Sequence, residues 1–196
     1  MANKNIWMTA DIIDWINNLG NEKTKTINTL SRAAFNGNDL NIRTTTGYPG
    51  VYEIRFITNS GPRLYSTCKN NTFVIFKAGN KTSGNQNDDW KQAAKEIKAK
   101  YGTVLDSLVD HDDTNKVKYD GELFYNYADI DTLRMFNLND KQLSVLPTQV
   151  RGQLLNSSEY QAPITEKPTL DKINAWQAVE FDSSPSKTLS KWAKKI

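Results

Sequence analysis

The feature that most constrains the fold is a change in the spacing of apolar residues along the first half of the chain. Up to residue 35, apolar residues recur every three or four positions, in two segments at residues 8–19 and 22–35. This spacing is typical of helices that bury one face. Gly20-Asn21 ends the first segment, so the two helices are predicted to form an αα-hairpin.

From residue 51 the period changes to two. Residues 51–57 alternate in character, and residues 63–69 and 72–78 form two further runs of this kind. A period of two indicates half-buried strands. Asn70-Asn71 joins the last two runs, and asparagines tolerate the positive φ angles of a tight hairpin turn. We therefore expect a three-stranded antiparallel meander.

Residues 88–101 are predicted to form a helix, with acids at its start and lysines at its end, and Gly102 is expected to close it. Residues 1–102 then constitute an α+β unit in which the αα-hairpin packs on a small antiparallel sheet. Residues 103–196 are expected to be a separate, mostly helical C-terminal region. Its predicted elements are strands at 116–119 and 123–127, and helices at 130–136, 140–155 (interrupted by Pro147), 170–179 and 186–195.

Charge divides the chain at the same place. Residues 1–102 hold 14 lysines and arginines against 8 acids, a net charge of +6, whereas residues 103–196 hold 11 against 14, a net charge of −3. Eight of these acids crowd into residues 106–131. A basic first half can attract a polyanion, and an acidic segment can compete for that surface; the simpler interpretation is that both are ordinary solvated faces.

Composition excludes several classes of protein. The 196 residues include 20 aromatic side chains, more than a disordered chain would hold, and contain no apolar run long enough to span a membrane. The single cysteine, Cys68, and the single histidine, His111, cannot build a zinc or haem site. We expect a cytoplasmic protein that needs no metal and no cofactor and does not engage a membrane.

Residues 8–102 carry four landmarks in an order that resembles a known family. The landmarks are Trp15 near the first helix, the Glu53-x-Arg55 strand, the turn and strand Gly61-Pro62-Arg63-Leu64-Tyr65, and the turn Gly79-Asn80-Lys81-Thr82-Ser83 before the last helix. This pattern is similar to the RelE/ParE superfamily of toxins, and in particular to its HigB-like addiction module killer branch. The chain departs from that pattern at Ser66-Thr67, where the family usually has a bulky residue.

The resemblance implies a metal-independent endoribonuclease that cuts translated messages on the ribosome and is inhibited by an antitoxin. RNA cleavage by a 2′-hydroxyl needs a proton acceptor, a proton donor and charge stabilisation at phosphorus. The candidate catalytic residues that match the family's motif are Arg55, Arg63, Lys81, Tyr65 and Glu53. The candidate RNA-binding residues are Lys69, Lys77 and Arg43.

Each candidate also has a purely structural interpretation. Arg55 and Arg63 suit a bidentate phosphate clamp, but strand arginines also keep a sheet edge soluble. Lys81 is equally a turn residue, and Tyr65 a packing residue. Glu53 is a possible base, yet a salt bridge to Arg55 or Arg63 is the simpler role. The nuclease hypothesis requires the two guanidinium groups to converge in a groove that is open to a polynucleotide.

The second half leaves three alternatives open. Residues 103–196 could inhibit the enzyme in cis by laying the acidic stretch on the basic cleft, or could dock it to a different target. In the third alternative the whole chain is a non-catalytic binding protein, for example one encoded by a phage, that engages a host factor through this region.

Overall fold

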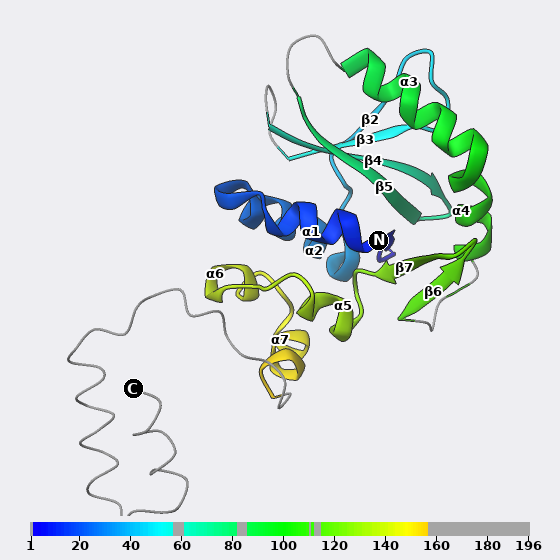
Figure 1. Cartoon of the computed structure of the whole chain (residues 1–196). Coiled ribbons are helices and arrows are strands. Elements are labelled where there is room, and N and C mark those ends of the chain that lie inside the picture. Colours follow the sequence, from blue (N-terminus) through cyan, green and yellow to red (C-terminus); the bar gives the residue numbers. More distant parts are fainter. Residues whose placement is uncertain (1, 57–60, 82–85, 110, 112–114, 157–196) are drawn as a thin grey trace, which may run out of the picture. The chain divides into compact units, whose positions relative to one another are not determined.

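A seven-stranded mixed sheet forms the centre of the computed structural model, which describes residues 2–56, 61–81, 86–109, 111 and 115–156 (Figure 1). All of these residues belong to one compact unit, Met1–Ala162. The helices predicted at 170–179 and 186–195 lie outside the described residues. The protein is a mixed α+β protein, as the sequence predicts.

The strands are β1 (Asn5–Met8), β2 (Ile42–Thr44), β3 (Tyr52–Arg55), β4 (Gly61–Lys69), β5 (Thr72–Lys81), β6 (Lys116–Tyr119) and β7 (Glu122–Asn126). Their order across the sheet is β2-β3-β4-β5-β1-β7-β6. β1 runs parallel to β5, and all other neighbours are antiparallel. The predicted meander is confirmed as β3-β4-β5, and its turn residues Asn70 and Asn71 have φ angles of 50° and 63°.

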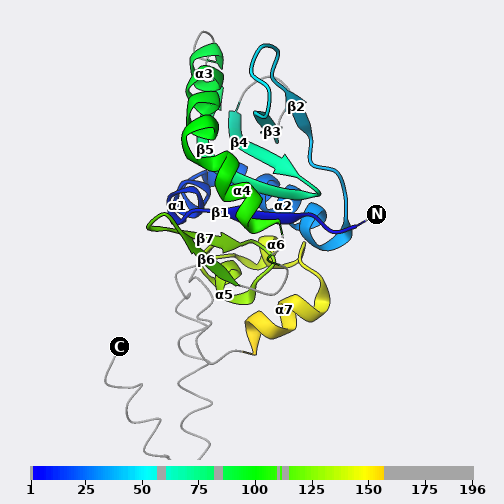
Figure 2. The same cartoon turned by 90° about the vertical axis from the view of Figure 1, so that its right-hand side faces the viewer.

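The helices are α1 (Ala10–Asn17), α2 (Lys23–Asn36), α3 (Gln86–Glu96), α4 (Gly102–Leu108), α5 (Ile130–Arg134), α6 (Asp140–Leu143) and α7 (Thr148–Leu155), with short turns η1 (Gly20–Glu22) and η2 (Ile97–Tyr101). Helices α1, α2 and α5–α7 pack on one face of the sheet, and α3, η2 and α4 on the other (Figures 1 and 2). Three layers result, with the sheet in the middle.

Strand β1 was not predicted, and its place explains why. Ile6 and Met8 pack into the core beneath α1 and α2, whereas Trp7 faces α4 on the other side. Because β1 is buried on both faces, its sequence shows no alternation of apolar and polar residues. The prediction that a helix begins at Met8 was wrong by two residues, since α1 begins at Ala10.

The sheet is also larger than the small antiparallel sheet that was predicted, because the second half of the chain extends it. β7 pairs with β1 through Trp7↔Asn126 and Met8↔Tyr125. The domain boundary expected at residue 102 therefore falls within one sheet and one compact unit.

Gly102 does not end the predicted helix, because the chain continues from α3 through a π turn into α4. In the π turn the Gly102 amide donates to the Ile97 carbonyl, five residues earlier. A Cβ atom at residue 102 would lie 3.2 Å from that oxygen, so this glycine serves a close backbone approach inside the helix.

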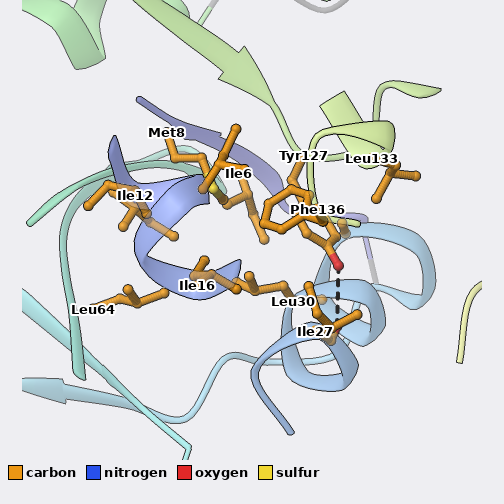
Figure 3. Close-up of a cluster of buried hydrophobic side chains, with 14 of the residues drawn as sticks. Ile6, Met8, Ile12, Ile16, Ile27, Leu30, Leu64, Tyr127, Leu133 and Phe136 are labelled. Carbon is orange, nitrogen blue, oxygen red and sulfur yellow. Dashed lines mark hydrogen bonds between the residues drawn. The ribbon is translucent and has the colours of Figure 1, made fainter. Parts of the chain in front are cut away.

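The main core also joins both halves of the chain (Figure 3). Tyr127 is fully buried, and its hydroxyl lies 2.8 Å from Ser31 Oγ and donates to the Ile27 carbonyl at 3.3 Å. Its ring packs edge-on against Phe136, with centroids 5.3 Å apart. Residues after 102 thus complete the core beneath α1 and α2.

Candidate functional site

Strand register brings four of the predicted catalytic residues together. β3 and β4 pair with Glu53 opposite Tyr65 and Arg55 opposite Arg63. Residues two apart on a strand share a face, so all four side chains lie on one face of the sheet, and Tyr65 shows that it is the face under α3. Glu53, Arg55, Arg63 and Tyr65 therefore lie together on this face of the sheet.

The Glu53 carboxylate is the centre of this arrangement. Its Oε1 accepts hydrogen bonds from Arg55 Nε at 2.8 Å and Arg63 Nε at 3.1 Å. Its Oε2 accepts from Gln86 Nε2 at 2.7 Å and Trp90 Nε1 at 2.8 Å, both on α3. We call these five residues the Glu53 cluster. Of the roles considered for Glu53, the salt bridge to the arginines is the one that the structure contains.

Burial separates the two arginines. The side chains of Glu53 and Arg63 are fully buried, whereas 21% of the Arg55 side chain is exposed. Arg63 Nη1 also donates to the Pro62 carbonyl at 2.9 Å. The Arg63 guanidinium is therefore sealed against a carboxylate of its own chain, and the Arg55 side chain reaches the surface.

Two guanidinium nitrogens in this cluster lack a hydrogen-bond partner among the described residues. Nη2 of Arg55 and Nη2 of Arg63 are buried, and neither donates a hydrogen bond within the part of the chain that the structure describes. A buried donor without an acceptor is costly, so the cluster retains capacity for one more acceptor.

The electrostatics of the cluster oppose proton transfer. Burial alone would raise the pKa of the Glu53 carboxyl, but hydrogen bonds from Arg55, Gln86 and Trp90 and the charge of Arg55 outweigh it and hold that pKa below its usual value. Burial and the Asp89 carboxylate, which accepts from the Tyr65 hydroxyl at 3.0 Å, raise the pKa of Tyr65. Neither residue is poised to accept a proton near pH 7.

The other predicted residues lie at or beyond the rim of the cluster. Lys81 is the last residue of β5 and pairs in register with Gly61, so its backbone lies at the same end of the sheet as Arg63. The guanidinium of Arg43, on the edge strand β2, lies 5.3 Å from the centre of the Trp90 ring. Arg43 and Lys81 thus flank the cluster without forming part of its hydrogen-bond network.

Lys77 and Lys69 are engaged elsewhere. Lys77 Nζ lies 3.9 Å from the Glu96 carboxylate on α3. Lys69 Nζ bonds to Asp106 at 2.8 Å, and it lies six residues along β4 from Arg63, about 20 Å at the rise of a strand. Lys69 therefore does not share a site with the two arginines.

The described part of the acidic stretch at 106–131 does not cover the cluster. Asp106 pairs with Lys69, Glu122 with Lys100 and Asp131 with Arg134. Strands β6 and β7 lie at the sheet edge opposite β2 and β3. The carboxylate that pairs with Arg55 and Arg63 is Glu53, within the first half of the chain.

Gln86 and Asp89 were not among the predicted site residues, and Trp90 was predicted only as a core residue. Gln86 and Trp90 are one helical turn apart and donate to the same carboxylate. One feature of the sequence could have indicated this contact. Gln86 and Trp90 place two side-chain N–H donors on one face of α3, where they can bond to a glutamate on a neighbouring strand.

Comparison of the chain with family models, with curated proteins and with solved structures finds no match. The resemblance to RelE/ParE toxins therefore rests on the motifs in the sequence. Among the described residues, no helix is both long and apolar enough to cross a membrane, and no three His, Cys, Asp or Glu side chains gather as metal ligands would.

Proposed function

We propose that the chain is a non-catalytic binding protein on a RelE-like scaffold. The observation that carries this proposal is the Glu53 carboxylate, which is fully buried and accepts four hydrogen bonds from its own chain. A general base needs a free lone pair within reach of the substrate, and Glu53 has neither access nor capacity.

Arg63 supports the same conclusion. A phosphate clamp needs guanidinium N–H groups that face the ligand, whereas the Arg63 side chain is fully buried between Glu53 and the Pro62 carbonyl. The arginine and the carboxylate then hold β3 and β4 against α3, which is a structural role.

The partner in this proposal is a host protein, engaged through the region after residue 102. Three large apolar side chains are exposed in the described residues, Ile42, Leu123 and Leu155. Leu123 on β7 and Leu155 on α7 both follow residue 102, in the region proposed to engage a host factor.

The proposal is tested by primer extension on messages from cells that express the full chain. We expect no discrete cuts with the wild type. Any effect on growth should persist in Arg55→Ala and be lost in Leu123→Asp. Arg55→Ala is the matched variant because it removes the partly exposed arginine of the cluster and leaves the buried Arg63–Glu53 pair in place. Cuts that disappear in Arg55→Ala would refute the proposal.

The endoribonuclease implied by the resemblance is the second candidate, and one observation favours it. Arg55 and Arg63 lie side by side, their Nη2 atoms bond to none of the described residues, and Lys81 lies at the same end of the sheet. An anionic acceptor such as a phosphate would satisfy these donors. This candidate would act on messages at the ribosome in the cytoplasm, under control of an antitoxin.

The same assay separates the two candidates. The enzyme predicts discrete cuts in the wild type that are lost in both Arg55→Ala and Lys81→Ala, while Lys118→Ala, an exposed lysine on β6, retains them. Absence of cuts in all four proteins excludes the enzyme under these conditions and favours the binding protein.

A further inference from the structure

A polar groove lies on the face of the sheet opposite the Glu53 cluster, where η1 and the start of α2 meet α6. Its volume is about 650 Å³. The lining residues used in the argument below are Asn21, Thr24, Lys25, Asn28, Asn139 and Lys141, above the buried Gln142. We call it the α2–α6 groove. None of the functions considered above uses it.

The floor of the groove is held by a fixed set of hydrogen bonds. Asn139 Oδ1 accepts a hydrogen bond from the backbone N–H of Gln142 at 3.0 Å, and Gln142 Oε1 accepts one from the backbone N–H of Asn139 at 3.1 Å. The two bonds form a reciprocal capping box at the start of α6. Gln142 Nε2 donates to Thr24 Oγ1 on α2 at 3.2 Å. Because only 3% of Gln142 is exposed, its side chain is fixed by these hydrogen bonds and is not a solvated surface group.

These bonds leave hydrogen-bond donors uncommitted at the groove. Thr24 Oγ1 accepts from Gln142, so its own hydrogen is available. Asn139 uses its carbonyl oxygen in the capping box and keeps its Nδ2 amide. Asn21 and Asn28 add two more side-chain amides that bond to no other described residue. An apolar ligand would leave these groups without acceptors.

The charge of the lining is positive. Of the described residues that line it, two are lysines, Lys25 and Lys141, and none is a carboxylate. Lys25 Nζ lies 3.7 Å from the Glu22 carboxylate, which offsets part of its charge. Lys141 makes no ion pair with any described residue. The groove therefore favours an anion over a cation.

We propose that the α2–α6 groove binds a sugar phosphate. The phosphate would be held by Lys141 and Lys25, and the sugar hydroxyls, which both donate and accept, would bond to the amides and to Thr24. An inorganic anion would use the lysines alone, whereas a phosphorylated sugar engages both sets of groups. The volume accommodates a ligand of this size.

A sugar phosphate can come from a free small molecule or from a strand of RNA. Arg32 separates the two sources, because it lies one helical turn beyond Asn28 on α2, is exposed, and does not line the groove. A bound oligonucleotide would extend along the helix to Arg32, and a single sugar phosphate would not.

The test is isothermal titration of the full chain with ribose 5-phosphate, with ribose, and with a short single-stranded oligouridylate. We expect ribose 5-phosphate to bind with a Kd of about 1 mM or tighter and ribose not to bind detectably. Lys141→Ala and Asn28→Ala should each weaken binding about tenfold. Lys118→Ala is the matched control, an exposed lysine on β6 that should leave the affinity unchanged.

The remaining outcomes are decisive. If the oligouridylate binds and Arg32→Ala weakens only that binding, the source is RNA; if it does not bind, the source is a free sugar phosphate. The proposal is overturned if neither phosphorylated probe binds, if ribose binds as tightly as ribose 5-phosphate, or if Lys141→Ala and Asn28→Ala both bind as the wild type does. Lys141 is exposed, so its variant is expected to fold, and its unfolding curve checks this.

Discussion

The Glu53 cluster and the α2–α6 groove are both rich in polar side chains, and they lie on opposite faces of one sheet. In the cluster, a buried carboxylate accepts four hydrogen bonds, two of them from arginines, so its polar groups are largely satisfied by the chain itself. In the groove, a buried glutamine network supports lysines and amides that remain open to a ligand. The two regions therefore differ in access rather than in the density of polar groups: the cluster is buried and leaves only two guanidinium Nη2 atoms without a described acceptor, whereas the groove presents its lysines and amides to solvent.

Loss of the Glu53 carboxylate should have the largest effect. Glu53→Ala leaves two guanidinium groups without their anion, one of them fully buried, and should lower the free energy of unfolding by about 3–5 kcal/mol. Urea unfolding followed by circular dichroism measures this. The control is Asp106→Asn at an exposed ion pair, which should cost less than about 1 kcal/mol. Equal stability of the two variants would contradict the structural role of the cluster.

Lowering the pH should gradually remove the stabilisation that the ionised Glu53 carboxylate provides. The pKa of Glu53 is lowered in the folded protein, so its contribution is full above the unfolded value of about 4.3 and is lost as the pH falls through the lower folded value. The wild type should therefore exceed Glu53→Gln in unfolding free energy at neutral pH, and this difference should shrink below about pH 4. A difference that stays constant down to about pH 3 would show that Glu53 is not the group that titrates.

Disruption of the groove floor should cost less. Gln142→Ala removes half of the capping box and the bond to Thr24, and should lower the free energy of unfolding by about 1–2 kcal/mol. Thermal unfolding at neutral pH measures the loss. Ser144→Ala, at an exposed residue of the same groove, should stay within about 0.5 kcal/mol of the wild type. If Gln142→Ala also leaves the free energy of unfolding within about 0.5 kcal/mol of the wild type, the Gln142 hydrogen bonds do not fix the floor of the groove.

The elements predicted correctly are those with local signals. Strands β3, β4 and β5 follow from a period of two and from the asparagine turn at residues 70 and 71. The interruption at Pro147 likewise separates α6 from α7. Strand β1 was missed because Ile6-Trp7-Met8 is apolar throughout, and the boundary at residue 102 was drawn because glycine usually ends a helix, whereas Gly102 lies within a helical segment that continues through a π turn.

The candidate site was predictable only in part, because only some of its contacts follow from local sequence patterns. The convergence of Glu53, Arg55, Arg63 and Tyr65 follows from strand register, which the motifs anticipate. The hydrogen bonds that bury Glu53 under α3 do not follow from that register, because Gln86 and Trp90 are 33 and 37 residues away from Glu53 in sequence. The α2–α6 groove could not be predicted either, because Gln142 and Thr24, which bond across it, are 118 residues apart in sequence.

The position of β1 has a consequence for the order of folding. This strand lies between β5 and β7, and its partners Phe73 and Asn126 are encoded far downstream of it. During synthesis, the first strand must wait until most of the described chain has left the ribosome before both of its edges can be satisfied.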